Sequence, residues 1–124
     1  HSDADVLLHA VSDALLGSLA LGDIGIHFPD SDPQFKDISS LELLGKVAGM
    51  VKEKGFRIGN IDVTLVAEQP KIANYMVQMQ ENIAQTAALE KDRISIKATT
   101  TEGLGFVGKG EGIAAHAVVL VEEV

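Results

Sequence analysis

Residues 113–121 read Ile-Ala-Ala-His-Ala-Val-Val-Leu-Val, an apolar run that predicts a β-strand. Apart from His116, both faces of this strand would be apolar. Helices can cover only one face of a small sheet, so the other face needs a second cover. A neighbouring subunit is the simplest candidate. We therefore expect residues 1–124 to form a single α+β domain that assembles into an oligomer.

Two further strands and three helices are predicted upstream. Alternating apolar residues predict strands over 58–67 and 94–99, and the first of these turns Ile61, Val63 and Leu65 to one face. Helical spacing of apolar residues predicts helices over about 2–22, 39–55 and 74–89.

Each of the first two helices has recognisable end signals. Ser2 and Ser39 are the predicted N-caps, each with an acidic residue three positions later. Gly22 and Gly55 are predicted to end these helices, because glycine readily adopts the left-handed conformation found just beyond a helix.

The composition fits a folded domain with an aliphatic core and excludes several classes of function. The chain is 46% apolar and has a formal net charge of −8, which argues against binding nucleic acid. It has no Cys, which excludes disulfides, thiolate zinc sites and thiol nucleophiles. No apolar run approaches the ~20 residues of a membrane-spanning helix, and no signal peptide opens the chain. We expect neither nucleic acid nor a membrane as a partner.

Asp5, His9 and Asp13 follow one another at intervals of four residues and so share one helix face. A His flanked by carboxylates can be a metal ligand whose ring those carboxylates orient. The alternative is a solvent-exposed His beside two helix-stabilising acids. Spacing alone favours the alternative, because a single imidazole is not a metal site. We assign the other two internal histidines, His27 and His116, to structure, the latter as a hydrogen-bonded core or interface residue.

Residues 22–33 combine Gly, Pro and Asp and predict an irregular surface loop. Its carboxylates, Asp23, Asp30 and Asp32, are either ligands for a hard cation or for sugar hydroxyls, or ordinary turn formers.

Thr99-Thr100-Thr101-Glu102 ends a predicted strand and is followed by a Gly-rich segment, 103–112. Hydroxyls and backbone N–H groups in such a turn can hold phosphate oxygens, and a nearby Glu can hold Mg²⁺ against them. The alternative is that Thr simply favours strands and Gly favours hairpins. The segment contains no Walker motif, and the chain has no serine-nucleophile motif.

Taken together, these segments resemble the 2-C-methyl-D-erythritol 2,4-cyclodiphosphate synthase family over essentially the whole chain. The resemblance is carried by His-Ser-Asp-Ala-Asp-Val…His at 1–9, by 14–17 and 21–30, by Gln-Pro-Lys at 69–71, by Lys-Ala-Thr-Thr-Thr-Glu at 97–102, and by 104–114. It implies a mixed β-sheet with helices packed on one face. It also implies a homotrimer with sheets packed around a three-fold axis and active sites between subunits.

The activity implied by the resemblance belongs to non-mevalonate isoprenoid synthesis. Such phosphorus–oxygen lyases convert 4-diphosphocytidyl-2-C-methyl-D-erythritol 2-phosphate into the cyclic diphosphate and release CMP. The family uses Zn²⁺ together with Mg²⁺ or Mn²⁺, and works in the bacterial cytoplasm or the plastid stroma. The alternative is a catalytically inactive trimer on the same scaffold that binds a nucleotide or another small molecule.

The resemblance also implies roles for individual residues. His9 would be a zinc ligand, Glu102 would reach the second metal, and His1 and Thr100 would stabilise the transition state. The implied substrate-binding residues are His1, Ser2, Asp23, Ile24, Gly25, Phe28, Pro29, Asp30, Ser31, Asp32, Ala67, Glu68, Gln69, Pro70, Lys71, Ile72, Ala73, Thr99, Thr100, Thr101, Glu102, Phe106 and Lys109.

The sequence departs from the family pattern in two places. The family's other two zinc ligands form an Asp-x-His motif on an N-terminal strand, and these residues contain no Asp-x-His. We therefore expect an upstream segment to be missing and the zinc site to be incomplete in this chain. Lys109 stands where an Arg is usual, which keeps the charge but loses bidentate contact with phosphate.

Overall fold

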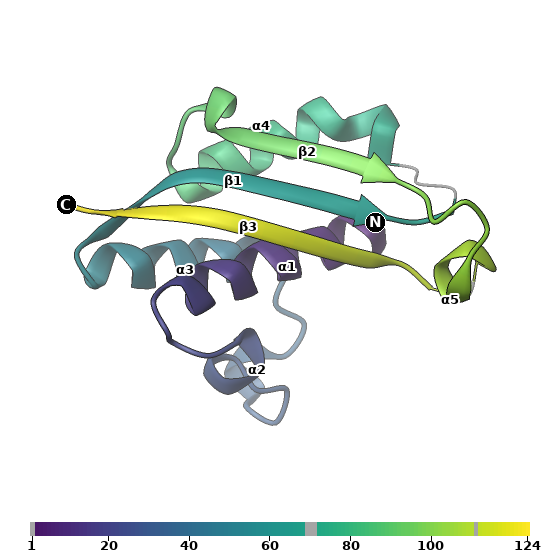
Figure 1. Cartoon of the computed structure of the whole chain (residues 1–124). Helices are drawn as coiled ribbons and strands as arrows, with labels where there is room; N and C mark the ends of the chain where they lie inside the picture. Colours follow the sequence, from purple (N-terminus) through teal and green to yellow (C-terminus); the bar gives the residue numbers. More distant parts are fainter. Residues whose placement is uncertain (1, 69–71, 111) are drawn as a thin grey trace.

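The structure, a computed structural model, describes residues 2–68, 72–110 and 112–124, and its centre is a three-stranded sheet (Figure 1). The strands are β1 (Phe56–Val66), β2 (Ile94–Thr99) and β3 (Ala114–Glu123), in the order β2-β1-β3. β1 runs parallel to β2 and antiparallel to β3. The prediction of an α+β fold with a mixed sheet is confirmed.

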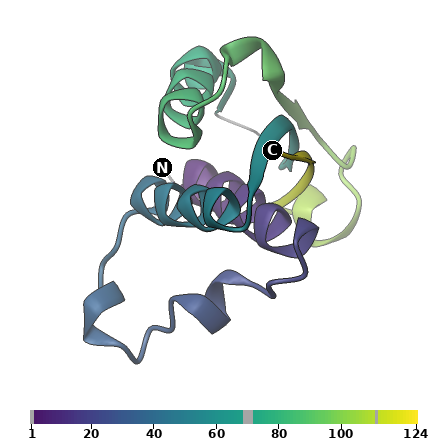
Figure 2. The same ribbon diagram turned by 90° about the vertical axis from the view of Figure 1, so that its left-hand side faces the viewer.

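Helices pack on one face of this sheet. The long ones are α1 (Ser2–Ser18), α3 (Ser40–Glu53) and α4 (Met76–Ala87). The short helical turns are α2 (Ile24–His27), η1 (Pro33–Phe35), η2 (Ile72–Tyr75), η3 (Lys91–Arg93) and α5 (Gly105–Gly108). Figure 2 shows α1 and α3 side by side, and the two helices are in contact. All three predicted long helices are present.

The core lies between these helices and β1. Ile61, Val63 and Leu65 of β1 are fully buried, as the alternation predicts. They belong to one cluster with fully buried residues of α1 and α3, among them Leu15 and Leu44. Burying one such side chain contributes about 1.5–3 kcal/mol. This cluster therefore fixes α1 and α3 against the sheet.

The helix ends agree with the prediction at α3 and differ at α1. The Ser39 hydroxyl accepts a hydrogen bond from the Glu42 N–H at 3.1 Å, so the predicted cap of α3 is confirmed. α1 already includes Ser2 and ends at Ser18, so the predicted stop at Gly22 is too late. The helix ends early because Ala20 adopts a left-handed conformation, with φ 57°. The Leu21 N–H then donates to the Leu16 carbonyl at 2.9 Å, which closes the last turn.

A β-bulge at Gly59 changes which residues of β1 face the helices. Ile58 pairs with Val121 while Asn60 pairs with Leu120, so Gly59 has no partner in the register. The extra residue reverses the alternation, and both Ile58 and Ile61 pack on the helical core.

β3 has two apolar faces, as predicted. Ala115, Ala117, Val119 and Val121 pack on the core, whereas the alternate residues Val118 and Leu120 are 70% and 59% exposed. His116 is exposed with them, because strand alternation turns it away from the helices, so it is not a core residue of the single chain. The other assignment, an interface residue, stays a prediction. His27 is structural, as predicted, with its Nε2 2.6 Å from the Leu21 carbonyl oxygen.

Candidate functional site

A pocket of about 520 Å³ gathers residues that the sequence singled out far apart along the chain. His9 of α1 lines it together with α2 and the residues that follow α2. The predicted site residues in its wall are His9, Ile24, Gly25, Phe28, Pro29 and Asp30; the remaining wall residues are Phe35, Asp37, Ile38 and Leu43.

The loop that forms this wall is more ordered than predicted. It contains α2, capped by Asp23, whose Oδ1 accepts from the Ile26 N–H at 3.0 Å. Asp32 caps η1 in the same way, accepting from the Gln34 N–H at 3.0 Å. Both carboxylates therefore act as turn formers through one oxygen. The second oxygen of each remains available to a ligand.

Two contacts order this loop. Asp13 Oδ1 accepts from the Ile24 N–H at 2.9 Å, which ties α2 to α1. The Phe28 and Phe35 rings meet edge to face, with centroids 5.2 Å apart. The pocket wall is therefore tied to α1 by a polar contact and held together by an aromatic contact between two of its own residues.

His9 is connected to α3 through a residue that the sequence did not identify. The Ser40 hydroxyl donates to Asp5 Oδ1 at 2.9 Å and lies 3.1 Å from His9 Nε2. Ser40 is only 8% exposed. No motif marks Ser40 in the sequence, because its position opposite α1 depends on how two helices pack.

The metal ligands implied by the resemblance do not form a complete site. Within residues 2–68, 72–110 and 112–124, no three His, Asp or Glu side chains converge as a metal-binding group. His9 can supply one imidazole ligand, whereas a catalytic zinc usually takes three protein ligands. His9 therefore fits one position of such a site, and the described residues do not complete it.

A second group of predicted residues lies where the parallel strands β1 and β2 end. The Ala67 N–H donates to the Thr99 carbonyl at 3.0 Å, and the Gly103 N–H donates to Glu68 Oε2 at 3.3 Å. The two stretches assigned to nucleotide and phosphate binding, 67–68 and 99–102, are therefore adjacent.

The three consecutive threonines differ in what their hydroxyls do. Thr101 Oγ1 donates to the Leu104 carbonyl at 2.6 Å, so its hydrogen is already used. Thr100 Oγ1 accepts from the Glu102 N–H at 3.2 Å and keeps its hydrogen for another acceptor. Thr99 Oγ1 makes only a long contact, 3.4 Å, to the Thr100 carbonyl. Thr100 is exposed and is the best-placed donor of the three.

The Gly-rich segment contains a helical turn, α5, rather than a plain hairpin. Its path needs glycine at Gly108, because a Cβ there would overlap the backbone of Gly103. Phe106 is 58% exposed and Lys109 is exposed on this segment, so both side chains are accessible to a ligand. Figure 1 shows α5 at the end of the sheet, beside the turn that follows β2.

His1, Gln69, Pro70 and Lys71 lie outside the described residues. Ser2 begins α1, and Ile72 and Ala73 lie in η2.

Among the helices that the structure describes, none is both long and apolar enough to cross a bilayer.

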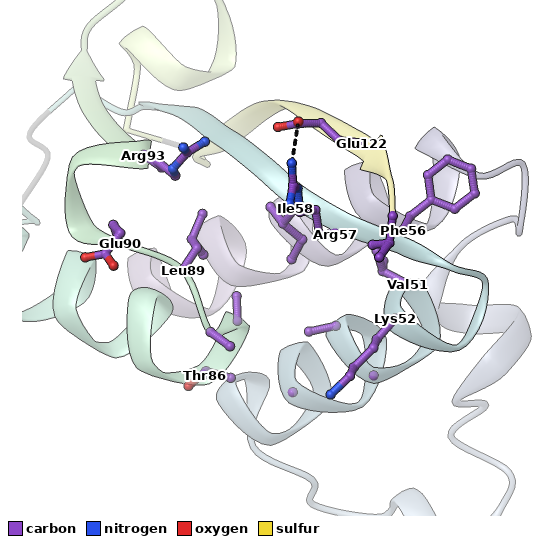
Figure 3. Close-up of a pocket in the computed structure, with 16 residues that line it drawn as sticks. Val51, Lys52, Phe56, Arg57, Ile58, Thr86, Leu89, Glu90, Arg93 and Glu122 are labelled. Carbon is purple, nitrogen blue, oxygen red and sulfur yellow. Dashed lines mark hydrogen bonds and ion pairs between the residues drawn. The ribbon is translucent and has the colours of Figure 1, made fainter.

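A larger cavity, of about 680 Å³, lies elsewhere, between α3, the end of α4 and the start of β1 (Figure 3). Arg57 lines it and pairs with Glu122 at 3.3 Å, and Arg93 lines it and donates to the Gly59 carbonyl. None of the predicted site residues lines this cavity. The smaller pocket at His9 is therefore the better candidate for the site.

The fold and the two groups of residues define an α+β domain equipped to bind a phosphorylated small molecule. The sequence profile of the YgbB family matches residues 1–122, and the chain belongs to this family. Two curated relatives, both called 2-C-methyl-D-erythritol 2,4-cyclodiphosphate synthase, agree with the resemblance seen in the sequence. The one from Syntrophomonas wolfei is 61% identical over 99% of this chain and 78% of its own length. The one from Geobacter sulfurreducens is 59% identical over the same shares.

Solved structures support the same fold. The bifunctional IspDF from Campylobacter jejuni superposes with a TM-score of 0.90 at 45% identity, over 96% of this chain and 32% of that chain. The IspF of Plasmodium falciparum, solved as a CDP complex, gives 0.83 at 30% identity, over 95% and 70%.

Proposed function

We propose that the chain acts as a 2-C-methyl-D-erythritol 2,4-cyclodiphosphate synthase. Membership of the family and the names of relatives such as that from Syntrophomonas wolfei support this activity. The observation that carries it is the pocket in which His9 meets Ile24, Gly25, Phe28 and Asp30. The resemblance implies that this pocket takes the metal and sugar end of the substrate.

The reaction is an intramolecular phosphoryl transfer. An oxygen of the 2-phosphate forms a bond to the β-phosphorus, and the bond from that phosphorus to the oxygen bridging the α-phosphate breaks. CMP leaves with that oxygen. Because the nucleophile is already an anion, no general base is required, and the enzyme must position and neutralise two anionic groups.

The charge of the chain supports a requirement for cations. A formal net charge of −8 cannot neutralise phosphates by itself. When bound, Zn²⁺ and Mg²⁺ or Mn²⁺ would neutralise and orient the phosphate oxygens. His9 would supply one ligand to the first, and Glu102 would hold the second.

The chain's own groups bind and orient the substrate. The Thr100 hydroxyl, which keeps its hydrogen, donates to a phosphate oxygen, and His1 assists it. Asp23, Gly25 and residues 28–32 contact the methylerythritol. Residues 67–73 and 99–102 bind the cytidine and its phosphates, as do Phe106 and Lys109. The complex of the Plasmodium falciparum relative with CDP supports a cytidine diphosphate ligand.

A homotrimer accounts for the separation of the two groups of residues. None of the residues that line the pocket at His9 comes from the turn around Thr100. A substrate that contacts both groups can do so where one subunit supplies the pocket and its neighbour supplies the turn. The exposed apolar side chains Val118 and Leu120 would then pack between subunits.

The test is to follow CMP release by phosphorus NMR, with the substrate, Zn²⁺ and Mg²⁺ present. Thr100→Val should lower turnover at least tenfold, and Thr100→Ser should keep most of it, because serine retains the donating hydroxyl. Thr86→Val is the matched control, since Thr86 lies on α4 and lines the cavity that none of the predicted site residues lines. Substrate binding without CMP release by the unmodified protein, its zinc ligands complete, would identify an inactive binding protein instead.

A further inference from the structure

We propose that Asp5 and Ser40 hold His9 in one tautomer and one orientation, with its Nε2–H directed at Ser40 and its Nδ1 lone pair as the atom that acts in the pocket. Ser40 is thus a positioning residue. This inference rests on the proposed function only in taking the pocket at His9 as the site of action.

The tautomer follows from counting hydrogens. A serine hydroxyl has one hydrogen, and an ionised carboxylate only accepts hydrogen bonds. Ser40 Oγ lies 2.9 Å from Asp5 Oδ1, so its hydrogen goes to that carboxylate. The same oxygen lies 3.1 Å from His9 Nε2 and can then only accept, which requires the hydrogen of the neutral imidazole to be on Nε2. Nδ1 is left with a free lone pair.

Ser40, which holds the imidazole ring of His9, is itself held firmly by the start of α3. Ser40 is nearly buried in the first turn of α3, and Ser39 caps that turn. α3 packs directly against α1, which carries His9. Imidazoles that bind metals usually have the second nitrogen held in this way, and losing the outer partner typically costs 10–100-fold in metal affinity or activity.

The two acids that flank His9 in the sequence have different tasks. Asp5 acts on His9 through Ser40, whereas Asp13 accepts from the Ile24 N–H at 2.9 Å and holds the pocket wall. The sequence spacing, which is the same on both sides of His9, does not reveal this difference.

The experiment is nitrogen-15 NMR of the metal-free chain at a pH where the imidazoles are neutral. Two histidines act as internal references. His27 is held by the Leu21 carbonyl through Nε2, and His116 is exposed. We expect His9 to resemble His27, with a single Nε2–H form and a slowly exchanging proton. A His9 tautomer ratio equal to that of His116, or a predominant Nδ1–H form, would overturn the proposal.

Variants show which side chains set the tautomer of His9. Ser40→Ala should bring the tautomer ratio of His9 to that of His116, and Ser40→Thr should restore it. Ser12→Ala removes the other buried hydroxyl and should leave His9 unchanged.

Asp5→Ala is the second variant, at an exposed position, in case Ser40→Ala fails to fold. It releases the Ser40 hydrogen, which can then be donated to Nε2, so the Nδ1–H form of His9 should rise, whereas Asp13→Ala should not change it.

This readout needs neither substrate nor metal, so it separates the two proposals. If His9 responds to Ser40→Ala but the full protein releases no CMP, the proposed function fails and the positioning stands. If CMP is released and the tautomer ratio of His9 changes with neither Ser40→Ala nor Asp5→Ala, the positioning proposal fails and the proposed function stands.

Discussion

Ser12 and Ser40 are the two buried polar side chains among the described residues, and their surroundings are opposite. Ser40 has two side-chain partners, whereas the fully buried Ser12 hydroxyl has none. An unsatisfied buried hydroxyl costs about 1–3 kcal/mol, and alanine also favours the helix. Ser12→Ala should therefore leave the free energy of unfolding unchanged or raise it by up to about 1 kcal/mol, measured by urea denaturation. A clear loss would mean that the hydroxyl has a partner after all.

Gly108 carries a second prediction for a single residue. A Cβ there overlaps the Gly103 backbone, so Gly108→Ala should distort the turn that presents Phe106 and Lys109. Because this turn lies beyond the ends of the strands, we expect KM to rise about tenfold or more, while urea unfolding changes little. Gly17→Ala is the control, since a Cβ at Gly17 meets nothing within 4 Å. Unaltered kinetics for Gly108→Ala would remove this turn from the substrate site.

Among the elements, the sequence predicts those whose patterns repeat over several turns or alternations. β1 and α3 are examples, because burial of one face gives each a clear period. α2 and α5 have four residues each, too few to show a period. α2 also depends on Asp13, eleven residues from Ile24, and no local pattern reveals that contact.

The sequence also predicts only part of the candidate site. It misses the residues whose position depends on contacts that no local pattern reveals. His9 and Thr100 are predicted site residues because the segments that contain them, 1–9 and 97–102, resemble the motifs of the family. Ser40 was missed because its role comes from the packing of α3 on α1. The different tasks of Thr100 and Thr101 depend on the hydrogen bonds of one turn, which three identical letters cannot show.

The start of α3 gives a prediction at the element scale. Ser39 caps this helix, and losing such a cap typically costs about 1 kcal/mol. Ser39→Ala should lower the free energy of unfolding by about that amount in urea denaturation, and Ser39→Asp should keep the cap. Fraying of this first turn should also loosen Ser40 and hence His9. Ser39→Ala as stable as the unmodified protein would mean that water replaces the cap.

For the whole molecule, the outward face of the sheet is its most informative surface. Lys97 and Asp62 form an ion pair of 2.8 Å across β2 and β1, whereas β3 presents Val118 and Leu120. A sheet face that is fully exposed to solvent would be polar on every strand. The mixture of one ion pair with exposed apolar side chains is typical of a surface that is partly buried by a partner.

A charge on this face tests the trimer directly. Val118 is 70% exposed in the single chain, so Val118→Asp should fold normally but place three carboxylates in the proposed contact between subunits. We expect the mass from sedimentation to fall from trimer to monomer and CMP release to be lost, because the two halves of each site would separate.

Val77, on α4, is 64% exposed and provides the matched control. Val77→Asp makes the same substitution on the helical side and should change neither mass nor activity. A Val118→Asp protein that keeps the unmodified mass would show that subunits do not meet on this face, and the proposal that the site is shared across it would be wrong.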